Sequence, residues 1–302
     1  LSSTLEHPAS MSAMKKWAKN TQRNHIIVEH NADSGSVDEQ AYIKKLTSDV
    51  RVVSIVHTSP VTGMTVDLEK ITKEVRNVTP DCIIIVDGIQ HSSHGAIDVQ
   101  KYDIDGYVVS PYKMFSRHGY GVAWASDRLC TLNKEQLADG PFQNWELGTR
   151  DAGSYATFSD VVDYLDWLGS NFTESENTRE RLEASSIAIK SHEQELVDLV
   201  INGAEDIVGL RNNKKIRIIG NSASTSREGV GSFFQENKPS SIIVEELRQR
   251  RIRVHIRKDD HYCGNILRPL NQKDCIRFSI CHYNSKAEVV EFMKAINEIS
   301  TN

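Results

Sequence analysis

The sequence predicts an α/β protein in which a mostly parallel sheet domain is followed by a smaller α+β domain. Between about residues 50 and 125, short β-branched runs alternate with polar, helix-compatible stretches, which is typical of strands covered by helices. From about residue 215 onward, short strands mix with two helical segments, which favours a small α+β domain. We therefore expect a large domain at residues 1–185 and a small one at residues 186–302.

Four strands and an intervening helix are expected in the first of these regions. The run CIIIVDG shows no alternation of apolar and polar residues, as in a strand that is buried on both faces. The expected strands lie within residues 50–57, 82–88, 105–113 and 121–126, and the polar stretch 67–78 is expected to be helical.

The second half of the chain has a different pattern. Two segments, 158–169 and a run through 192–209, combine helical spacing with dense charge, so we expect long amphipathic helices that cross between the domains. In the small domain, strands are expected at 215–220, 229–234, 251–256 and 275–280, and helices at 242–250 and 286–299.

Composition excludes several classes of function. The net charge of −5 comes from 41 acidic and 36 basic residues without a basic stripe, which disfavours a nucleic-acid partner. No stretch reaches the roughly 18 apolar residues of a membrane helix, so we expect a soluble protein without a membrane partner. The five cysteines have neither paired nor zinc-like spacing, so we expect no disulfide framework, no metal site and a cytoplasmic, reducing location.

Three segments at the ends of expected strands carry the candidate chemistry: 57–63, 87–90 and 110–113. In mostly parallel sheets, ligands bind beyond the carboxyl ends of the strands, where polar side chains converge on one crevice. We therefore expect these three segments to form one site.

Lys113 and Asp87 are the two residues of this set with the clearest chemistry. Partial desolvation beyond an apolar strand would lower the pKa of Lys113 toward that of a usable nucleophile. An ionised Asp87 at the end of IIIVDGIQ is costly unless it meets a cation or hydrogen-bond donors. The plainer interpretations are a surface lysine and a turn aspartate before Gly88. For Gln90 the alternatives are a ligand-facing amide and a loop residue.

A longer pattern surrounds these residues. The run VDGIQHSSHGAIDVQKYDIDGYVVSPYKMFSRHGYGVAWAS resembles the central part of the class V aminotransferase and cysteine desulfurase family, with a VD..Q strand end, an IDV turn, a lysine-bearing strand and a glycine-rich return. The segments TLEHPAS, WELGT and CIRFSICHYNSKAEV resemble further family segments, so the similarity spans essentially the whole chain.

The resemblance implies a pyridoxal 5'-phosphate (PLP) enzyme of fold type I, with a seven-stranded type of sheet. In that family Lys113 would form the Schiff base, and Asp87 would hold the protonated ring nitrogen that makes the ring an electron sink. Arg277 would clamp the α-carboxylate of an amino-acid substrate with its planar fork. The remaining cofactor-binding positions would be His7 on the ring face, Gln90 at the phenolic oxygen, Ser110, Tyr112, and Thr149, which reaches the phosphate of the partner subunit in a homodimer.

Plainer interpretations stand beside these assignments. In these, His7 only caps a helix, Thr149 is a turn residue, and Arg277 pairs with a structural acid. Two positions depart from the desulfurase pattern, because Tyr112 replaces the usual histidine and Pro60 stands where many relatives have asparagine. The family's N-terminal phosphate-binding segment has no counterpart before LEHPAS, so we expect either a fragment of a longer protein or a form with poor PLP affinity.

The reaction depends on Cys263, which lies in DDHYCGN where the desulfurases have their active loop. Arg257, Lys258 and His261 would favour its thiolate, which would attack the γ-sulfur of a cysteine-type substrate. A loop cysteine without a catalytic role is the alternative, and Cys275 and Cys281 are expected to be packing residues. Three functions follow: a cysteine desulfurase-like C–S lyase with a possible sulfur-acceptor protein, an epimerase or aminotransferase, or a non-catalytic scaffold or regulatory homologue.

Overall fold

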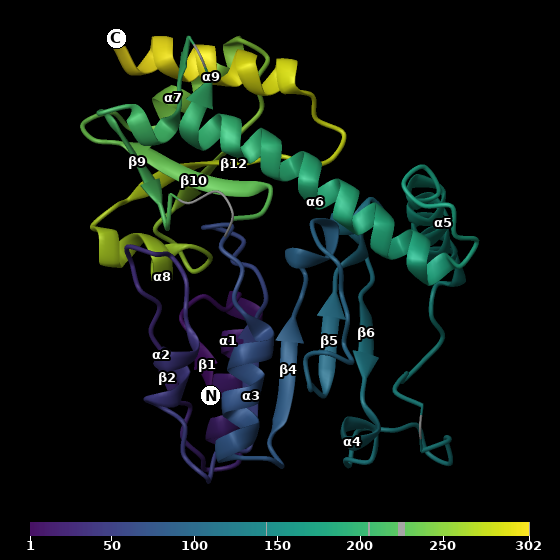
Figure 1. Ribbon diagram of the computed structural model, residues 1–302. Helices are drawn as coiled ribbons and strands as arrows, with labels where there is room; N and C mark the ends of the chain where they lie inside the picture. The colour runs from purple at the N-terminus through teal and green to yellow at the C-terminus, as the bar shows by residue number, and fades with distance from the viewer. Residues whose placement is uncertain (143, 205, 223–226, 302) are drawn as a thin grey trace.

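The computed structural model describes residues 1–142, 144–204, 206–222 and 227–301. It has two parts that follow one another along the chain (Figure 1). The first contains a sheet with helices beside it, and the second is a smaller layer of strands and helices packed over the upper ends of the sheet strands. A mixed α/β architecture with a smaller C-terminal part was predicted.

The central sheet has the order β3-β4-β5-β6. Strands β3, β4 and β5 are parallel and β6 is antiparallel, so the predicted mostly parallel character is confirmed. The strands are β3 (Val52–Val56), β4 (Ile83–Asp87), β5 (Gly106–Val109) and β6 (Val122–Ala125).

The described residues do not form one continuous seven-stranded sheet, so that expectation is wrong for this chain. The strands β1 (Ser2–Ser3) and β2 (Ile27–Val28) make a separate parallel pair. Leu1 bonds through its backbone to Val52 and Ser54, which places this pair beside β3. Each of the two strands is only two residues long, too short for a continuous ladder with the sheet.

Helix α3 (Leu68–Val78) lies against the sheet because one face of it is apolar. Asp67 caps its first turn by accepting a hydrogen bond from the backbone N–H of Lys70, and Ile71 and Val75 are fully buried. The other helices of this half are α1 (Pro8–Asn20), α2 (Glu39–Ile43), α4 (Asp127–Cys130), and the 3-10 turns η1 (His91–Ser93) and η2 (Pro111–Met114).

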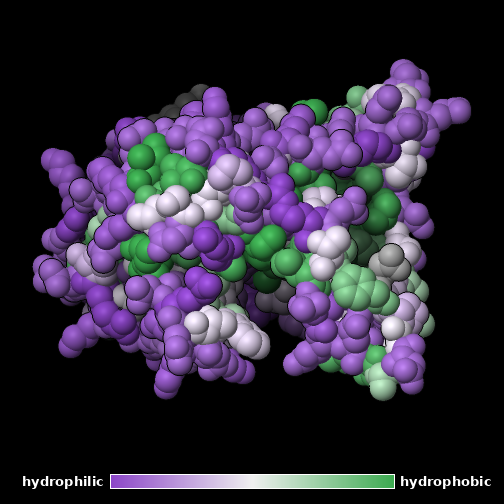
Figure 2. All heavy atoms as spheres, turned by 90° about the horizontal axis from the view of Figure 1, so that it is seen from below, coloured by the Kyte–Doolittle hydropathy of each residue, from purple (hydrophilic) through white to green (hydrophobic). Residues whose placement is uncertain are grey.

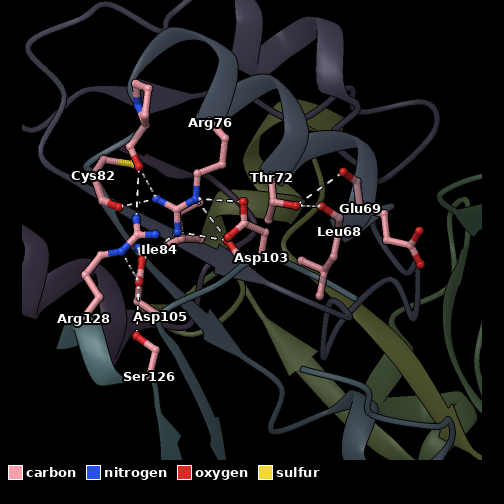
Figure 3. A network of polar contacts seen from close by, with 11 residues as sticks. Leu68, Glu69, Thr72, Arg76, Cys82, Ile84, Asp103, Asp105, Ser126 and Arg128 are labelled. Atoms are coloured by element: carbon pink, nitrogen blue, oxygen red, sulfur yellow. Dashed lines mark hydrogen bonds and ion pairs between the residues drawn. The ribbon is translucent and has the colours of Figure 1, made fainter. Parts of the chain in front are cut away.

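A polar network joins α3 to the amino ends of β4 and β5, at the edge of the sheet opposite Asp87 (Figure 3). The Arg76 guanidinium lies 2.8 Å from the carboxylate of Asp105, which is 1% exposed, and also donates to the backbone carbonyls of Asp103 and Cys82. The same carboxylate accepts from the Ile84 N–H. Nearly every polar atom of this buried cluster is thereby paired, as buried charges require.

The helices that cross between the two parts are α5 (Ala152–Gly169) and α6 (Thr178–Asn202). The expectation that the second helical run extends to residue 209 is wrong: α6 ends at Asn202, because Gly203 takes a positive φ of 80° and two short antiparallel strands follow the helix. The two helices pack against each other, and α6 continues from α5 across the top of the sheet to the small domain (Figure 1). The boundary expected between residues 185 and 186 falls inside α6.

The small domain is an antiparallel sheet of order β11-β12-β10-β9 covered by helices. Its own apolar core includes Phe233, Leu247, Ile276 and Met293. Its elements are β7 (Gly203–Ala204), β8 (Ile207–Val208), β9 (Ile216–Ile219), β10 (Val230–Gln235), α7 (Ser240–Gln249), β11 (His255–Lys258), α8 (Gly264–Leu267), β12 (Asp274–Ser279) and α9 (Lys286–Thr301).

One strand of the small domain begins later than the sequence predicted. The run 251–256 was expected to be extended, but β11 starts only at His255. Arg251, just after α7, has a φ of 62°, so the chain makes a left-handed turn there before the strand can begin.

The surface seen from below is mainly hydrophilic, with apolar patches between the polar side chains (Figure 2). Among the described residues, no helix combines the length and the apolar character that a membrane crossing requires.

Candidate active site

Two adjoining cavities lie between the carboxyl ends of β4 and β5 and the sheet of the small domain. The smaller, of about 130 Å³, is lined by Asp87, Ser110 and Lys113 among others. The larger, of about 430 Å³, is lined by Cys263 and Arg277 among others. Both share His7, Pro60, Gln90, Tyr112 and Lys113, so they form one site with two compartments.

Lys113 and Asp87 line the same small cavity, although they come from different strand ends. Asp87 is the last residue of β4 and is 6% exposed. Burial raises the pKa of its carboxyl, while the hydrogen bond from the Ile89 N–H and the nearby charges of His7 and Lys113 act in the opposite direction. The two residues therefore border one small cavity, where the sequence analysis expected them to converge.

Lys113 lies in η2, directly after β5. Its Nζ donates a 2.9 Å hydrogen bond to the side-chain oxygen of Gln90. Burial, together with the positive charges of Arg277 and Arg257, lowers its pKa to about 8, whereas Asp87 opposes the shift. The surface-lysine interpretation is therefore wrong: this amine is partly desolvated inside a cavity, as a nucleophile requires.

His7 lines both cavities and also caps a helix. Its Nδ1 accepts the Ala9 N–H at 3.2 Å at the start of α1, so the plainer interpretation holds as well. Burial lowers the pKa of its imidazole, and Asp87 raises it. The ring is thus held in place by the cap while it faces the carboxylate and the amine.

The remaining predicted cofactor residues are placed differently. Tyr112 borders both cavities but is 41% exposed, and its ring stacks on His118 with centroids 4.2 Å apart. Ser110 begins η2 and lines the smaller cavity. Thr149 is exposed and lines neither cavity, so within one chain it is not brought to the site.

Arg277 extends from the middle of β12 into the larger cavity. One of its terminal nitrogens donates to the carbonyl of Pro60 at 3.0 Å, and no acid in the described residues forms an ion pair with it. Burial, together with the neighbouring Arg257, lowers the pKa of Arg277 to about 10. A cation held in this way is suited to binding a carboxylate.

Cys263 lines the larger cavity but is only 2% exposed. Burial raises the pKa of its thiol, and Arg257 only partly offsets this effect. The expectation that neighbouring cations favour the thiolate is therefore wrong for this conformation, because desolvation has the larger influence.

Some residues of the site were not singled out from the sequence. His94 and Tyr262 line the larger cavity. The Nε2 of His94 lies 3.2 Å from the Gln90 amide, and its Nδ1 lies 2.7 Å from Glu193 of α6, which raises the pKa of His94 against the effect of burial. The histidine four residues after Gln90 in the IQHSSH run was the available signal, but Glu193, 99 residues from His94, had none.

Comparison with known proteins agrees with this geometry. The family model for class-V aminotransferases matches residues 1–292. The chain belongs to this family. Class-V aminotransferases are typically PLP-dependent.

Two curated relatives and one solved structure that the chain matches are distant in sequence. A protein of Pseudomonas putida named "Probable cysteine desulfurase" is 24% identical over 98% of this chain and 70% of its own length. A cysteine desulfurase of Synechococcus elongatus is 26% identical, and the chain spans only 45% of it. The solved cysteine desulfurase CsdA of Escherichia coli shares the fold, with a TM-score of 0.77 at 21% identity over 98% of this chain and 70% of that one.

The residues of the smaller cavity fit the ring of PLP. The buried carboxylate of Asp87 has no cation paired with it in the described part of the chain, and its pKa is raised by burial. A protonated ring nitrogen is the kind of cation that such a carboxylate requires. The Lys113 amine borders the same cavity.

Proposed function

We propose that this chain is a PLP-dependent enzyme that acts on an amino acid, and that its reaction is a desulfurase-like cleavage of a C–S bond. The observation that carries the proposal is the convergence of an amine, a buried carboxylate and a guanidinium on two adjoining cavities. The distant desulfurase relatives support the finer assignment.

Each residue of the site has a role in this proposal. Asp87 would hold the ring nitrogen, His7 the ring face, and Gln90 the phenolic oxygen, while Lys113 would hold the cofactor through its amine. When bound, PLP supplies an electron sink for the bonds at the substrate's α-carbon. Arg277 binds and orients the substrate carboxylate, and Lys113 Nζ, with a pKa of about 8, can take up or release a proton near neutral pH.

Replacing Lys113 by Ala tests whether the protein uses PLP. We expect purified protein incubated with PLP to show a visible absorbance band, and borohydride reduction followed by mass spectrometry to place the cofactor's mass on Lys113. Both signals should disappear in Lys113→Ala, while Lys134→Ala, which removes another lysine from the same half of the chain, should retain them. A band that survives Lys113→Ala would exclude this lysine, and no band in either protein would favour the scaffold alternative.

Cys263 decides between sulfur transfer and other reactions. If its thiol accepts the substrate's γ-sulfur, Cys263→Ser should lower sulfide and alanine formation from L-cysteine by about 100-fold or more, as expected when a nucleophile is removed. Cys130→Ser is the matched control, since Cys130 lies outside both cavities. Unchanged turnover in Cys263→Ser would favour the epimerase or aminotransferase alternative, for which the thiol has no role.

A further inference from the structure

A series of hydrogen bonds connects the Lys113 amine to helix α6. The Lys113 Nζ donates to Gln90 Oε1 at 2.9 Å, and the Gln90 Nε2 lies 3.2 Å from Nε2 of His94. On the other side of the ring, Nδ1 of His94 lies 2.7 Å from Oε2 of Glu193. Gln90, His94 and Glu193 are between 3% and 8% exposed, so the series runs through the interior of the protein.

The direction of these hydrogen bonds follows from the lysine. A lysine ammonium can only donate, so the Gln90 atom beside it is the oxygen, and the amide NH2 group faces His94. That NH2 group can only donate in its turn, so Nε2 of His94 accepts. The proton of the neutral imidazole then lies on Nδ1, which donates to the carboxylate of Glu193.

The charges around His94 agree with an ionised Glu193. Burial lowers the pKa of His94, but the hydrogen bond to Glu193 and its charge raise it above the usual value, and Glu228 acts in the same direction while Lys113 opposes it. Burial raises the pKa of the Glu193 carboxyl, whereas the bond with His94 lowers it. Glu193 also borders a polar cavity of about 80 Å³, which is large enough to hold water beside the carboxylate.

The Gln90 amide has a single oxygen to offer, and two donors lie within its reach. A proton on Nε2 of His94 would face the amide NH2 group, so the amide would have to turn its oxygen from Lys113 toward His94. The Lys113 ammonium would then face an NH2 group and lose its acceptor. The observed arrangement therefore requires an Nε2 atom that carries no proton.

We propose that His94 and Glu193 are positioning residues for Lys113: Glu193 holds the proton of His94 on Nδ1, and the free Nε2 keeps the Gln90 oxygen turned toward the lysine amine. The inference rests on the proposed function and deepens it, since Lys113 is the amine assigned there to the cofactor. The hydrogen bonds themselves exist without the cofactor, so they can be tested in its absence.

The pH midpoint of acylation at Lys113, followed by mass spectrometry in protein without cofactor, tests this role. Glu193→Gln allows the proton of His94 to move to Nε2, so the Gln90 oxygen is no longer held toward the amine. We expect the midpoint to fall by about one pH unit, since a charge-assisted hydrogen bond to the ammonium is weakened. Glu193→Asp keeps a carboxylate and should retain most of the wild-type midpoint. Glu195→Gln is the matched control, because it removes a charge from an exposed position of α6 that lines neither cavity of the site.

A double mutant separates the hydrogen bonds from a direct effect of charge. In Gln90→Leu the amine has already lost its acceptor, so adding Glu193→Gln should cause no further shift if the influence passes through Gln90. The other charged or titratable groups around the amine are unchanged in every variant: Arg277, Arg257, Asp87 and His7.

Two results would overturn the proposal: a midpoint that is unchanged or raised in Glu193→Gln, or a fall of the same size when Glu193→Gln is added to Gln90→Leu. Circular dichroism and the unfolding temperature establish that each variant is folded. If Glu193→Gln does not fold, the same fall is expected for His94→Asn, whose shorter side chain cannot reach Gln90 and Glu193 together. Failure of the proposed function, seen as a missing absorbance band with PLP, remains a separate result.

Discussion

Lys113 shows how the folded chain changes the chemistry of a single side chain. Its position after an apolar strand was visible in the sequence, but its environment was not. Burial and the charge of Arg277, 164 positions away in the numbering of the chain, bring its pKa to about 8 from an ordinary value of 10.5. The amine is thus partly deprotonated near neutral pH, which a surface lysine is not.

We expect the neighbours of Lys113 to shift its titration in opposite directions. Arg277→Gln removes a cation and should raise the pKa of Lys113, whereas Asp87→Asn removes a favourable charge and should lower it. The pH dependence of amine acylation at Lys113, followed by mass spectrometry in protein without cofactor, measures both shifts. An acylation midpoint for Lys113 that equals that of exposed lysines would contradict this interpretation of the site.

At the scale of the elements, most of the fold could be predicted from the sequence because local patterns determine it. The strand β4 follows an unbroken apolar run that ends in Asp87, and α3 follows a helical spacing of apolar residues after a capping aspartate. Lys113, Asp87 and Gln90 were found in the same way, since each lies at or just after the end of such a strand. Arg277 was assigned from the family resemblance and not from a local pattern.

The features of the fold and of the site that could not be predicted from the sequence depend on contacts between segments that are distant along the chain. The pairs His94–Glu193 and His91–Glu228 join residues 99 and 137 positions apart, and no local pattern marks their acidic members. The burial of Cys263 likewise arises from tertiary packing, which overrides the charges of its neighbours in sequence. The late start of β11 follows from a backbone turn at Arg251 that propensity does not indicate.

The network of Arg76 at the amino ends of β4 and β5 should be a major source of stability. Arg76→Met would leave the buried Asp105 carboxylate without its best partner, so we expect the free energy of unfolding to fall by about 3–5 kcal/mol. Arg248→Met, which breaks an exposed ion pair with Glu245, should cost less than about 1 kcal/mol. Urea denaturation measures the free energy of unfolding of both variants. An equal loss of stability in Arg76→Met and Arg248→Met would contradict the larger contribution that we assign to the buried ion pair.

At the scale of the whole molecule, the exposed apolar residues around Thr149 favour the proposed homodimer. Leu132, Leu137, Phe142, Trp145 and Leu147 are each between 44% and 49% exposed. Exposed apolar groups concentrated along one stretch of chain commonly mark an interface. A dimer formed there would cover Thr149, which lies outside the cavities of its own chain.

Trp145→Asp should therefore shift sedimentation equilibrium toward the monomer, by about tenfold or more in dissociation constant, since a buried aromatic anchor would be lost. Trp17→Asp is the matched control, because Trp17 is 60% exposed on α1. A wild-type protein that sediments as a monomer at all concentrations would rule out this interface.

Helix α6 has 25 residues and carries Glu193, the partner of His94, partway along its length. At a rise of about 1.5 Å per residue it is a rod of roughly 37 Å that belongs to both halves of the chain. Because α6 runs without interruption from one half of the chain to the other, the two halves are not connected by a flexible linker at this point. We therefore expect them to tumble in solution as one rigid body. Access for a ligand would then depend on the short loop that carries Tyr262 and not on a swinging motion of one half against the other.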